Sequence, residues 1–338
     1  MPSRVLLATC SLAEKWTKSG DPINGHYPLG LGYLHSVLEQ AGHDVQTMFL
    51  SLVPHEECLR ALVDKIAAFN PQVLGISIIS DSRVSSFRSI EYIHTNYPDI
   101  KIVLGGVHVS TMHEQIARRF PYCTLALGEA EVTLCELVHA FETNSDISAV
   151  NGIAFFQNEQ VIQTEERELI DDLDMLPYPK HTVFFSDKRI EAQILTSRGC
   201  PFACTFCVMD SFSRRKVRFR SAQSVVDEME HILREFPQVE RMQILDDQFF
   251  TDNKRVVEIC DEIVRRNIHC ELHCAGRMKP ITKEMVAALE RAGFVTVHLG
   301  LESGSQSVLK RAKKGITPDD AIRAMKLFAD SSIHINIL

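Results

Sequence analysis

The feature that most constrains the fold is the alternation of short apolar runs with amphipathic stretches along nearly the whole chain. In the first 150 residues, apolar runs such as 4–9, 72–79 and 101–106 alternate with helical patterns such as 29–42 and 55–70. Strands that are apolar on both faces and alternate with helices favour an α/β fold with a doubly wound parallel sheet. Such sheets bind ligands beyond the carboxyl ends of their strands. These ends are expected at residues 9–10, 79–81, 105–108 and 128–131.

A second strand–helix series begins near residue 189. Four apolar runs are each followed by a helical pattern, and a fifth run starts at residue 333, just before the end of the sequence. Because such units count up toward six or eight in barrel-like folds, we expect a partial (β/α) barrel in a chain truncated at its C-terminus. Between the two series, residues 151–166 are expected to form a hairpin and residues 169–181 an acidic, proline-bearing linker. The predicted domains are therefore 1–145, a hairpin and linker at 146–188, and 189–338.

Length and composition agree with two soluble domains. The chain has 338 residues, of which 45% are hydrophobic and 24% charged, and its formal net charge is −8. The acidic balance argues against a nucleic-acid partner. The N-terminus "MPSRVLLATC" lacks the apolar core of a signal peptide, and no long apolar run predicts a membrane span. We therefore expect a cytoplasmic protein whose ten cysteines are thiols or metal ligands rather than disulfides.

The stretch "TSRGCPFACTFCVMD" at 196–210 carries three cysteines, Cys200, Cys204 and Cys207, directly after the first strand of the second series. Structural zinc sites and ferredoxin clusters use four protein ligands. A [4Fe–4S] cluster held by three thiolates instead leaves one iron open to another ligand, which explains the count. The alternative is a zinc site completed by Cys270 or Cys274, although cysteines flanking a strand are more often buried apolar fillers.

The segment "CPFACTFC" resembles the CxxxCxxC loop of radical S-adenosylmethionine (SAM) enzymes, including the aromatic residue, Phe206, before the last cysteine. The resemblance implies a [4Fe–4S] cluster on Cys200, Cys204 and Cys207, whose open iron binds SAM. Electron transfer to SAM then produces a 5′-deoxyadenosyl radical. In such enzymes the protein orients and insulates the cofactors that do this chemistry.

Three further segments match the same family at later strand ends. They are "ILDDQFF", where Leu245 precedes the acids, "GRM" and "GLESGS". The resemblance implies SAM contacts from Phe206, Asp246, Asp247, Arg277, Glu302 and Ser303. The structural alternatives are solvated strand-end acids and a surface ion pair for the arginine. In "VRFRSAQSVVDEME", by contrast, we interpret Arg220 and Ser221 as helix-entry residues, with Ser221 as the N-cap.

The N-terminal domain carries "GGVHVS" at 105–110, whose glycines allow a ligand close to the backbone. With "YPLGLGYLHSVLEQAGHDV" and "LALGEAEVTLCELV", it resembles the cobalamin-binding domain of B12-dependent radical SAM enzymes, in that family's domain order. The implied cobalamin contacts are Gly105, Gly106, His108, Ser110, Gly128 and Glu129. The family's common Asp-x-His-x-x-Gly motif is missing from 9–21, so the corrin is expected without a histidine below the cobalt. The alternative is that the domain has lost cobalamin.

His108 and the cysteines of this domain are not expected to bind cobalt or a second cluster. We interpret His108 as a contact of the cobalamin tail or a loop histidine, because it follows the fourth strand rather than the first. Cys10, at the end of the first strand, is more consistent with a core cysteine than with a corrin contact. Methylthiotransferases bind a second cluster through three N-terminal cysteines, but Cys58 falls on a helical pattern, so Cys10, Cys58 and Cys123 do not reproduce that set.

The resemblance implies a cobalamin-dependent methyltransferase acting on an unactivated carbon or a phosphinate. In that mechanism the deoxyadenosyl radical removes a substrate hydrogen, methylcobalamin donates the methyl group, and a second SAM remethylates the cobalt. The alternatives are a cyclase or rearrangement enzyme without methyl transfer, and a truncated cofactor-binding chain without turnover. The expected partners are a small-molecule or natural-product substrate and a reductant such as flavodoxin or ferredoxin.

Overall fold

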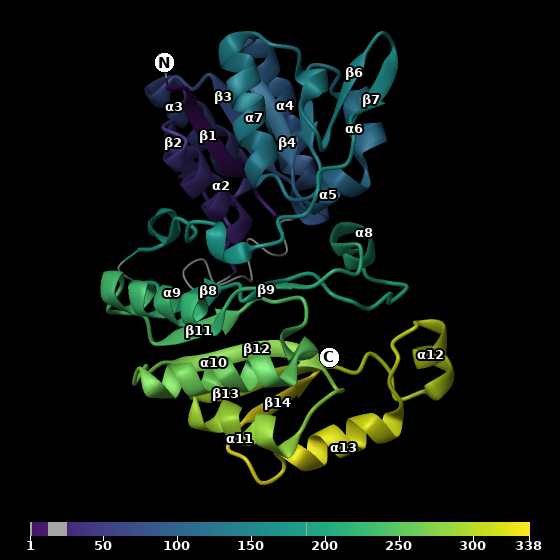
Figure 1. The fold of residues 1–338 in the computed structure, drawn as a ribbon. Coiled ribbons are helices and arrows are strands. Elements are labelled where there is room, and N and C mark those ends of the chain that lie inside the picture. The colour runs from purple at the N-terminus through teal and green to yellow at the C-terminus, as the bar shows by residue number, and fades with distance from the viewer. Residues whose placement is uncertain (1, 13–25, 187) are drawn as a thin grey trace. The chain divides into compact units, whose positions relative to one another are not determined.

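The computed structural model describes residues 2–12, 26–186 and 188–338. The chain divides into two compact units (Figure 1). The first runs to Leu169 and also includes Leu176–Phe185, and the second comprises Ile170–Met175 and Ser186–Leu338. The predicted linker is therefore shared, because its first part packs with the second unit and its second part with the first unit.

The first unit contains a seven-stranded sheet in the order β2-β1-β3-β4-β5-β6-β7. Its strands are β1 Arg4–Thr9, β2 Asp44–Met48, β3 Val73–Ser77, β4 Lys101–Gly105, β5 Thr124–Ala126, β6 Ile153–Gln157 and β7 Gln160–Gln163. Its helices are α2 Leu29–Gln40, α3 His55–Phe69, α4 Arg83–Asn96, α5 Val107–Thr111, α6 His113–Arg119 and α7 Glu131–Thr143. Strands β1 to β5 run parallel, which confirms the α/β expectation.

The order β2-β1-β3-β4-β5 is that of flavodoxin-like sheets, in which the ligand crevice lies at the switch point between β1 and β3. The apolar runs in the sequence form the middle of this sheet, where Leu6, Leu74 and Leu104 are fully buried. Since both faces are covered, the ends of the strands are where the unit can offer polar groups to a ligand.

The predicted hairpin forms, but it is part of the first sheet rather than of a connector. β6 pairs antiparallel with β5 and with β7, so the sheet is mixed. Asn158 and Glu159 both have positive φ at its two-residue turn, as a type I′ hairpin requires. The apolar side chains of β6 are buried in the unit, which explains why the segment does not stay separate.

The second unit contains a parallel five-stranded sheet in the order β14-β13-β12-β11-β8. Its strands are β8 Glu191–Ile194, β11 Arg241–Ile244, β12 Glu271–Arg277, β13 Phe294–Gly300 and β14 His334–Ile337. Its helices are α8 Met209–Ser213, α9 Ala222–Glu235, α10 Asn253–Arg265, α11 Lys283–Arg291, α12 Gln306–Arg311 and α13 Pro318–Phe328. Alternate strand residues such as Met242, Cys274 and Val297 are fully buried, as expected of the face that the helices cover.

The first strand expected in this unit, directly before the three-cysteine loop, is divided in two. β8 ends at Ile194, and Ser197–Arg198 form β9, which pairs antiparallel with β10 Arg218–Phe219 outside the main sheet. The short helices α5, α8 and α12 were not predicted either, because five or six residues are too few to show a helical period.

The N-cap predicted at Ser221 is confirmed, since its hydroxyl accepts a hydrogen bond from the Ser224 amide at 3.1 Å. Asp252, Thr282 and Thr317 cap the next helices α10, α11 and α13 in the same way. These caps satisfy orphan amides at the carboxyl edge of the sheet, where each helix begins. Among the described residues, no helix is long and apolar enough to cross a membrane.

Candidate cofactor sites

The three-cysteine loop follows β9 at the carboxyl edge of the second sheet. Cys204 is buried, Cys200 is half-buried and Cys207 is exposed. The Cys207 amide donates to the Cys204 carbonyl at 3.0 Å, and the Thr205 amide donates to the Ala312 carbonyl at 3.1 Å. The loop is therefore a turn anchored to the segment after α12. Burial raises the pKa of the Cys200 thiol.

Gly199, just before the first cysteine, allows a backbone conformation that other residues would strain. Its φ is +96°, and a Cβ atom there would lie 2.2 Å from the Lys216 carbonyl oxygen. The Gly199 amide donates to Asp247 Oδ2 at 3.1 Å. Desolvation raises the pKa of the Asp247 carboxyl, although this hydrogen bond opposes the rise. A glycine is thus required at this position by the close approach of the 213–216 segment.

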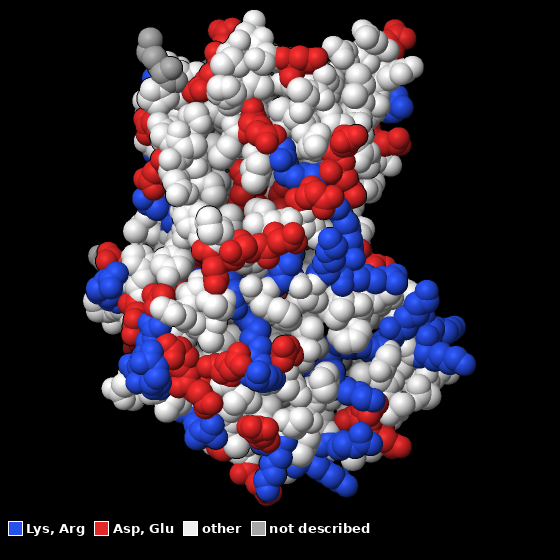
Figure 2. Space-filling model, viewed as in Figure 1, with Lys and Arg blue, Asp and Glu red and all other residues white. Residues whose placement is uncertain are grey.

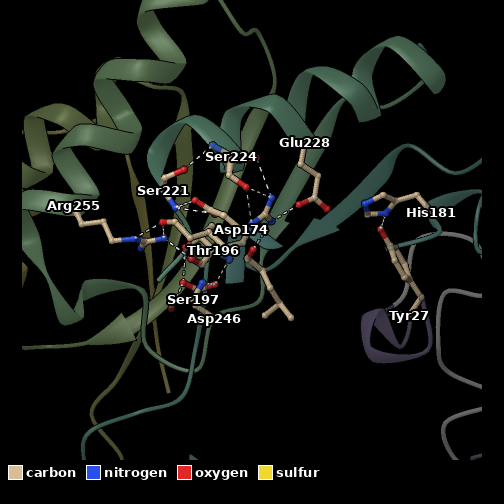
Figure 3. A network of polar contacts seen from close by, with 12 residues as sticks. Tyr27, Asp174, His181, Thr196, Ser197, Ser221, Ser224, Glu228, Asp246 and Arg255 are labelled. Atoms are coloured by element: carbon tan, nitrogen blue, oxygen red, sulfur yellow. Dashed lines mark hydrogen bonds and ion pairs between the residues drawn. The ribbon is translucent and has the colours of Figure 1, made fainter. Parts of the chain in front are cut away.

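Asp246 holds the chain that leads into the loop (Figure 3). Its Oδ1 accepts from the amides of Thr196 and Ser197 at 2.6 and 3.0 Å, and its Oδ2 accepts from their hydroxyls at 2.6 and 2.5 Å. The residue is only 4% exposed. These four bonds explain why the predicted first strand breaks after Ile194, since Thr196 and Ser197 bond to a side chain instead of a strand.

A second layer of charged groups holds Thr196 from the other side. Its carbonyl accepts from the Arg220 amide at 3.0 Å and from the Arg255 guanidinium. Arg220 in turn forms a buried ion pair with Glu228. Arg220 therefore does more than mark the helix entry, because its backbone and side chain both brace the strand that precedes the loop.

Arg277, at the end of β12, lies against the loop. Its Nη1 donates to Cys204 Sγ at 3.3 Å, and its guanidinium carbon lies 3.7 Å from the centre of the Phe202 ring. The residue is 6% exposed, yet its Nε and Nη2 have no hydrogen-bond partner in the described part of the chain. A buried guanidinium with two free donors fits a carboxylate, which takes two parallel hydrogen bonds. This feature fits the carboxylate of SAM beside the cysteine loop.

Glu302 lies beyond β13 in a left-handed conformation, with φ of +70°. Lys314 Nζ donates to its Oε1 at 2.8 Å and lies 5.8 Å from the centre of the Phe206 ring. Ser303 Oγ accepts from the Ser305 amide at 3.1 Å. The structure thus brings Glu302 and Phe206 together through Lys314, while the hydroxyl of Ser303 shapes the local turn.

The residues predicted for this site are joined by three that the sequence did not indicate. Phe202 stacks on Arg277, Gln248 accepts from the Arg277 amide at 2.9 Å, and Lys314 pairs with Glu302. Phe202 lies inside the recognised loop, so its position was a usable clue. Lys314 is one of several lysines in "KRAKKG", and no pattern distinguishes it from its neighbours.

In the described residues, no group of three or more His, Cys, Asp or Glu side chains is placed to hold a single metal ion. This gives no support to the zinc alternative, and burial raises the pKa of Cys270, to about 12, and of Cys274. A [4Fe–4S] cluster has a different requirement, because each cysteine binds a separate iron and the three thiols need not converge on one point.

Gly106 forms a tight turn at the carboxyl edge of the first sheet. Its φ is +94°, and a Cβ atom there would lie 2.7 Å from the Ile78 carbonyl oxygen. At neighbouring Gly105 a Cβ atom would come no closer than 3.8 Å to the Ala126 oxygen. Of these two neighbours, Gly106 is the one that requires the absence of a side chain, because its φ is left-handed and the Ile78 backbone packs directly against it.

The other predicted residues of this edge also lie near one another. Ser110 Oγ accepts from the Gly128 amide at 3.0 Å, which ties α5 to the end of β5. His108 Nδ1 lies 3.1 Å from Ser80 Oγ. His108 is in helix α5 rather than in a loop, and burial lowers its pKa. Glu129 follows Gly128 in the next loop.

The remaining N-terminal predictions concern cysteines and a missing motif. Cys10 and Cys58 are fully buried and Cys123 is 2% exposed, so all three are core residues. The segment 9–21, which lacks the cobalt-ligating histidine motif, falls largely on residues 13–25, outside the described residues.

Two domain families match the chain. A B12 binding domain matches residues 24–138, and the Radical SAM superfamily matches residues 194–338. The "Uncharacterized methyltransferase PH0819" of Pyrococcus horikoshii is 27% identical over 313 residues, covering 91% of this chain and 67% of that protein. The "Anaerobic magnesium-protoporphyrin IX monomethyl ester cyclase" of Rubrivivax gelatinosus is 27% identical over 329 residues, covering 93% and 59%.

Two solved structures establish the same fold. The cobalamin-dependent SAM radical enzyme OxsB, with aqua-cobalamin and SAM bound, has a TM-score of 0.86 at 24% identity and covers 99% of this chain and 49% of that one. The radical SAM methyltransferase TsrM from Kitasatospora setae has a TM-score of 0.82 at 20% identity and covers 99% and 67%. The chain thus spans about half to two thirds of the length of these proteins.

Proposed function

The chain belongs to the radical SAM proteins that carry a B12 binding domain, and on this premise we propose that it is a cobalamin-dependent methyltransferase. The proposed substrate is a small molecule or natural product with an unactivated carbon or a phosphinate. The similarity to the methyltransferase of Pyrococcus horikoshii supports methyl transfer. The proposed domains are a cobalamin-binding domain at 1–145, extended by the hairpin and by the second part of the linker at 146–188, and a radical SAM domain at 189–338.

We assign the [4Fe–4S] cluster to Cys200, Cys204 and Cys207, and SAM to the same edge of the second sheet. When bound, the cluster supplies the electron that cleaves SAM to a radical, and cobalamin serves as the methyl carrier. The observation that carries the proposal is Arg277, whose buried Nε and Nη2 lack a partner in the described residues while Nη1 contacts a loop cysteine. Its free donors suit the SAM carboxylate.

Some of the other side chains at this edge are proposed to contact SAM, and others to position the cysteine loop. Phe206 and Glu302, joined by Lys314, are proposed to contact SAM. Asp246 uses both carboxylate oxygens on Thr196 and Ser197, which supports a positioning role rather than a direct contact. Asp247 and Ser303 stay SAM-contact proposals.

Cobalamin is proposed to bind at the carboxyl edge of the first sheet. The tight turn at Gly106, where a Cβ atom would collide with the Ile78 backbone, fixes the backbone that we propose to contact the cofactor. The remaining proposed contacts come from the ends of β4 and β5 and from α5. They are Gly105, His108, Ser110, Gly128 and Glu129.

A cyclase is the second candidate, because three proteins named as magnesium-protoporphyrin IX monomethyl ester cyclases match at 26–28% identity. Methyl transfer separates the two functions without knowledge of the substrate. A methyltransferase of this class transfers label from methyl-labelled SAM to cobalamin, and a cyclase does not. Labelled cobalamin after anaerobic incubation therefore favours the methyltransferase.

The cluster assignment is tested by anaerobic reconstitution with iron and sulfide. We expect the brown cluster absorbance in the wild type and in Cys270→Ala, and its loss in Cys207→Ala. Cys207 is the exposed ligand, so its loss should leave the fold intact by circular dichroism. A wild-type protein without the absorbance, or a Cys207→Ala variant that retains it, contradicts the proposal. Reduction in the presence of SAM should yield 5′-deoxyadenosine. We propose a cytoplasmic location and a flavodoxin or ferredoxin as the electron source.

A further inference from the structure

Exposed basic residues surround the three-cysteine loop on a chain that is acidic as a whole. Residues 209–216 and 306–317 carry seven Lys or Arg and one acidic residue, Asp210, against a net charge of −8 for the chain. Two of the seven are not exposed, since Lys314 is buried against Glu302 and Arg214 is half-buried with a partner of its own. The remaining five form what we name the basic rim: Arg215, Lys216, Lys310, Arg311 and Lys313.

The two halves of the rim meet at the loop. The Thr205 amide bonds to the Ala312 carbonyl, so residues 310–313 lie beside Cys204 and Cys207. Ser213 Oγ donates to the Cys200 carbonyl at 3.2 Å, and the Lys216 carbonyl lies against Gly199. The positions of 215–216 are therefore set by contact with the other end of the same loop.

The rim is exposed, and its charge is largely uncompensated. All five side chains are in exposed residues. Asp210 bonds to Arg215 at 2.7 and 3.1 Å, which leaves five cations against one carboxylate, a net charge of +4. Figure 2 shows Lys and Arg side chains gathered over the region where α12 lies in Figure 1. Between the halves, Phe206 is 57% exposed and Cys207 is also exposed.

We infer that the basic rim docks an acidic one-electron donor protein next to the three-cysteine loop. The inference rests on the proposed function, because a cluster on this loop needs an external electron for each SAM that it cleaves. One electron leaves the donor's reduced cofactor and enters the cluster, and no atom is transferred. Transfer slows steeply with distance, so the donor must approach where the loop meets solvent.

The position of the rim beside the cysteine loop, together with its charge, favours such a donor over other acidic partners. Redox encounters use small interfaces and depend on steering between opposite charges. The net charge of −8 opposes an acidic protein over the chain as a whole, whereas the rim attracts one, so the field favours approach and orientation at the rim. RNA would need an extended basic surface, and the net charge of −8 opposes it.

The test uses the variant Lys310→Glu/Arg311→Glu. Both side chains are in the last turn of α12, where a reversed charge costs little stability. The matched control is Arg234→Glu/Lys326→Glu, which makes the same change in net charge in the last turns of α9 and α13. Because helices in a parallel strand–helix series end at the amino edge of the sheet, these control residues lie away from the loop.

The measurement is anaerobic stopped-flow reduction of the reconstituted protein by reduced flavodoxin. We expect the rim variant to slow the second-order rate about tenfold or more at low ionic strength, as for other steered pairs. The difference should vanish near 1 M salt, where the Debye length is about 3 Å. The control variant should match the wild type. Photoreduced deazariboflavin, a small uncharged reductant, should reduce all three proteins at one rate.

Several outcomes overturn the inference. They are an equal flavodoxin rate for the wild type and the rim variant, slower reduction of the rim variant by deazariboflavin, and rim-dependent binding of an RNA oligonucleotide that displaces flavodoxin. If the wild type assembles no cluster, the proposed function fails. Docking at the rim is then tested by titration calorimetry of oxidised flavodoxin with the cluster-free proteins. Loss of binding in the rim variant, but not in the control variant, supports docking. Equal binding by the wild type and the rim variant overturns the inference.

Discussion

The carboxyl edges of the two sheets both carry candidate cofactor sites, but side chains form most of the site in the second unit and backbone groups form most of it in the first. In the second unit, buried charged side chains shape the edge, with Asp246 accepting four hydrogen bonds and Arg277 lying against Cys204. In the first unit, backbone groups shape the edge, through the tight turn at Gly106 and the Gly128 amide that bonds to Ser110. The first kind of site should respond to small changes in side-chain chemistry, and the second to an added methyl group.

The largest expected effect is that of Asp246→Asn. The amide nitrogen would face the donors of Thr196 or Ser197, which leaves buried amides or hydroxyls unsatisfied at a cost of about 3 kcal/mol or more in total. We expect a lower urea midpoint and faster hydrogen exchange at residues 196–200. Asp261→Asn is the control, because its side chain is 60% exposed, and it should change stability by less than about 0.5 kcal/mol. Unchanged hydrogen exchange at residues 196–200 would show that the hydrogen bonds from Thr196 and Ser197 to Asp246 are not needed to hold this segment.

The glycine-built edge is tested by comparing Gly106→Ala with Gly105→Ala. At Gly106 the positive φ and the approach of 2.7 Å to the Ile78 oxygen both oppose a side chain. We expect a loss of about 2–3 kcal/mol from strain and overpacking. Gly105→Ala meets nothing closer than 3.8 Å and should be much milder. Cobalamin binding, measured by visible spectrum, should fall in the first variant only, and equal behaviour of the two would contradict a role for the Gly106 turn in binding.

Arg277→Lys tests the side-chain site while keeping the charge. Lysine lacks the fork that binds both carboxylate oxygens, so SAM affinity should fall about tenfold, or ~1.4 kcal/mol. Equilibrium dialysis on the reconstituted protein measures this. Arg291→Lys, on an exposed helix position, should bind SAM like the wild type. Full affinity in Arg277→Lys would mean that the guanidinium does not contact the SAM carboxylate.

The smallest expected effect concerns Ser221, the N-cap of α9. Ser221→Ala removes the hydrogen bond to the Ser224 amide and should cost about 1 kcal/mol of unfolding free energy. Ser305→Ala is the matched control, because Ser305 is the N-cap residue of α12 but makes no cap hydrogen bond. Urea unfolding of the two variants gives the comparison. An equal loss in both would assign the effect to serine removal in general rather than to the cap.

Much of this arrangement could be predicted from local pattern. The apolar runs become parallel strands, Ser221 caps α9, and the three-cysteine loop follows the first strand region of its unit. The errors concern long-range pairing. The break after Ile194 depends on Asp246, 50 residues further along the chain from Thr196, and the hairpin joins β5 because its apolar residues need a buried surface.

The sequence by itself determined the two strand–helix series, the family resemblance and the identity of the three cysteines, because these depend on residue type and spacing along the chain. Only the tertiary structure decided that Asp246 is saturated, that Arg277 keeps two donors free, and that Lys314 rather than its neighbours pairs with Glu302. Hydrogen-bond partners and burial depend on which strand ends meet in space. Sheet pairing sets that proximity, and no local pattern encodes it.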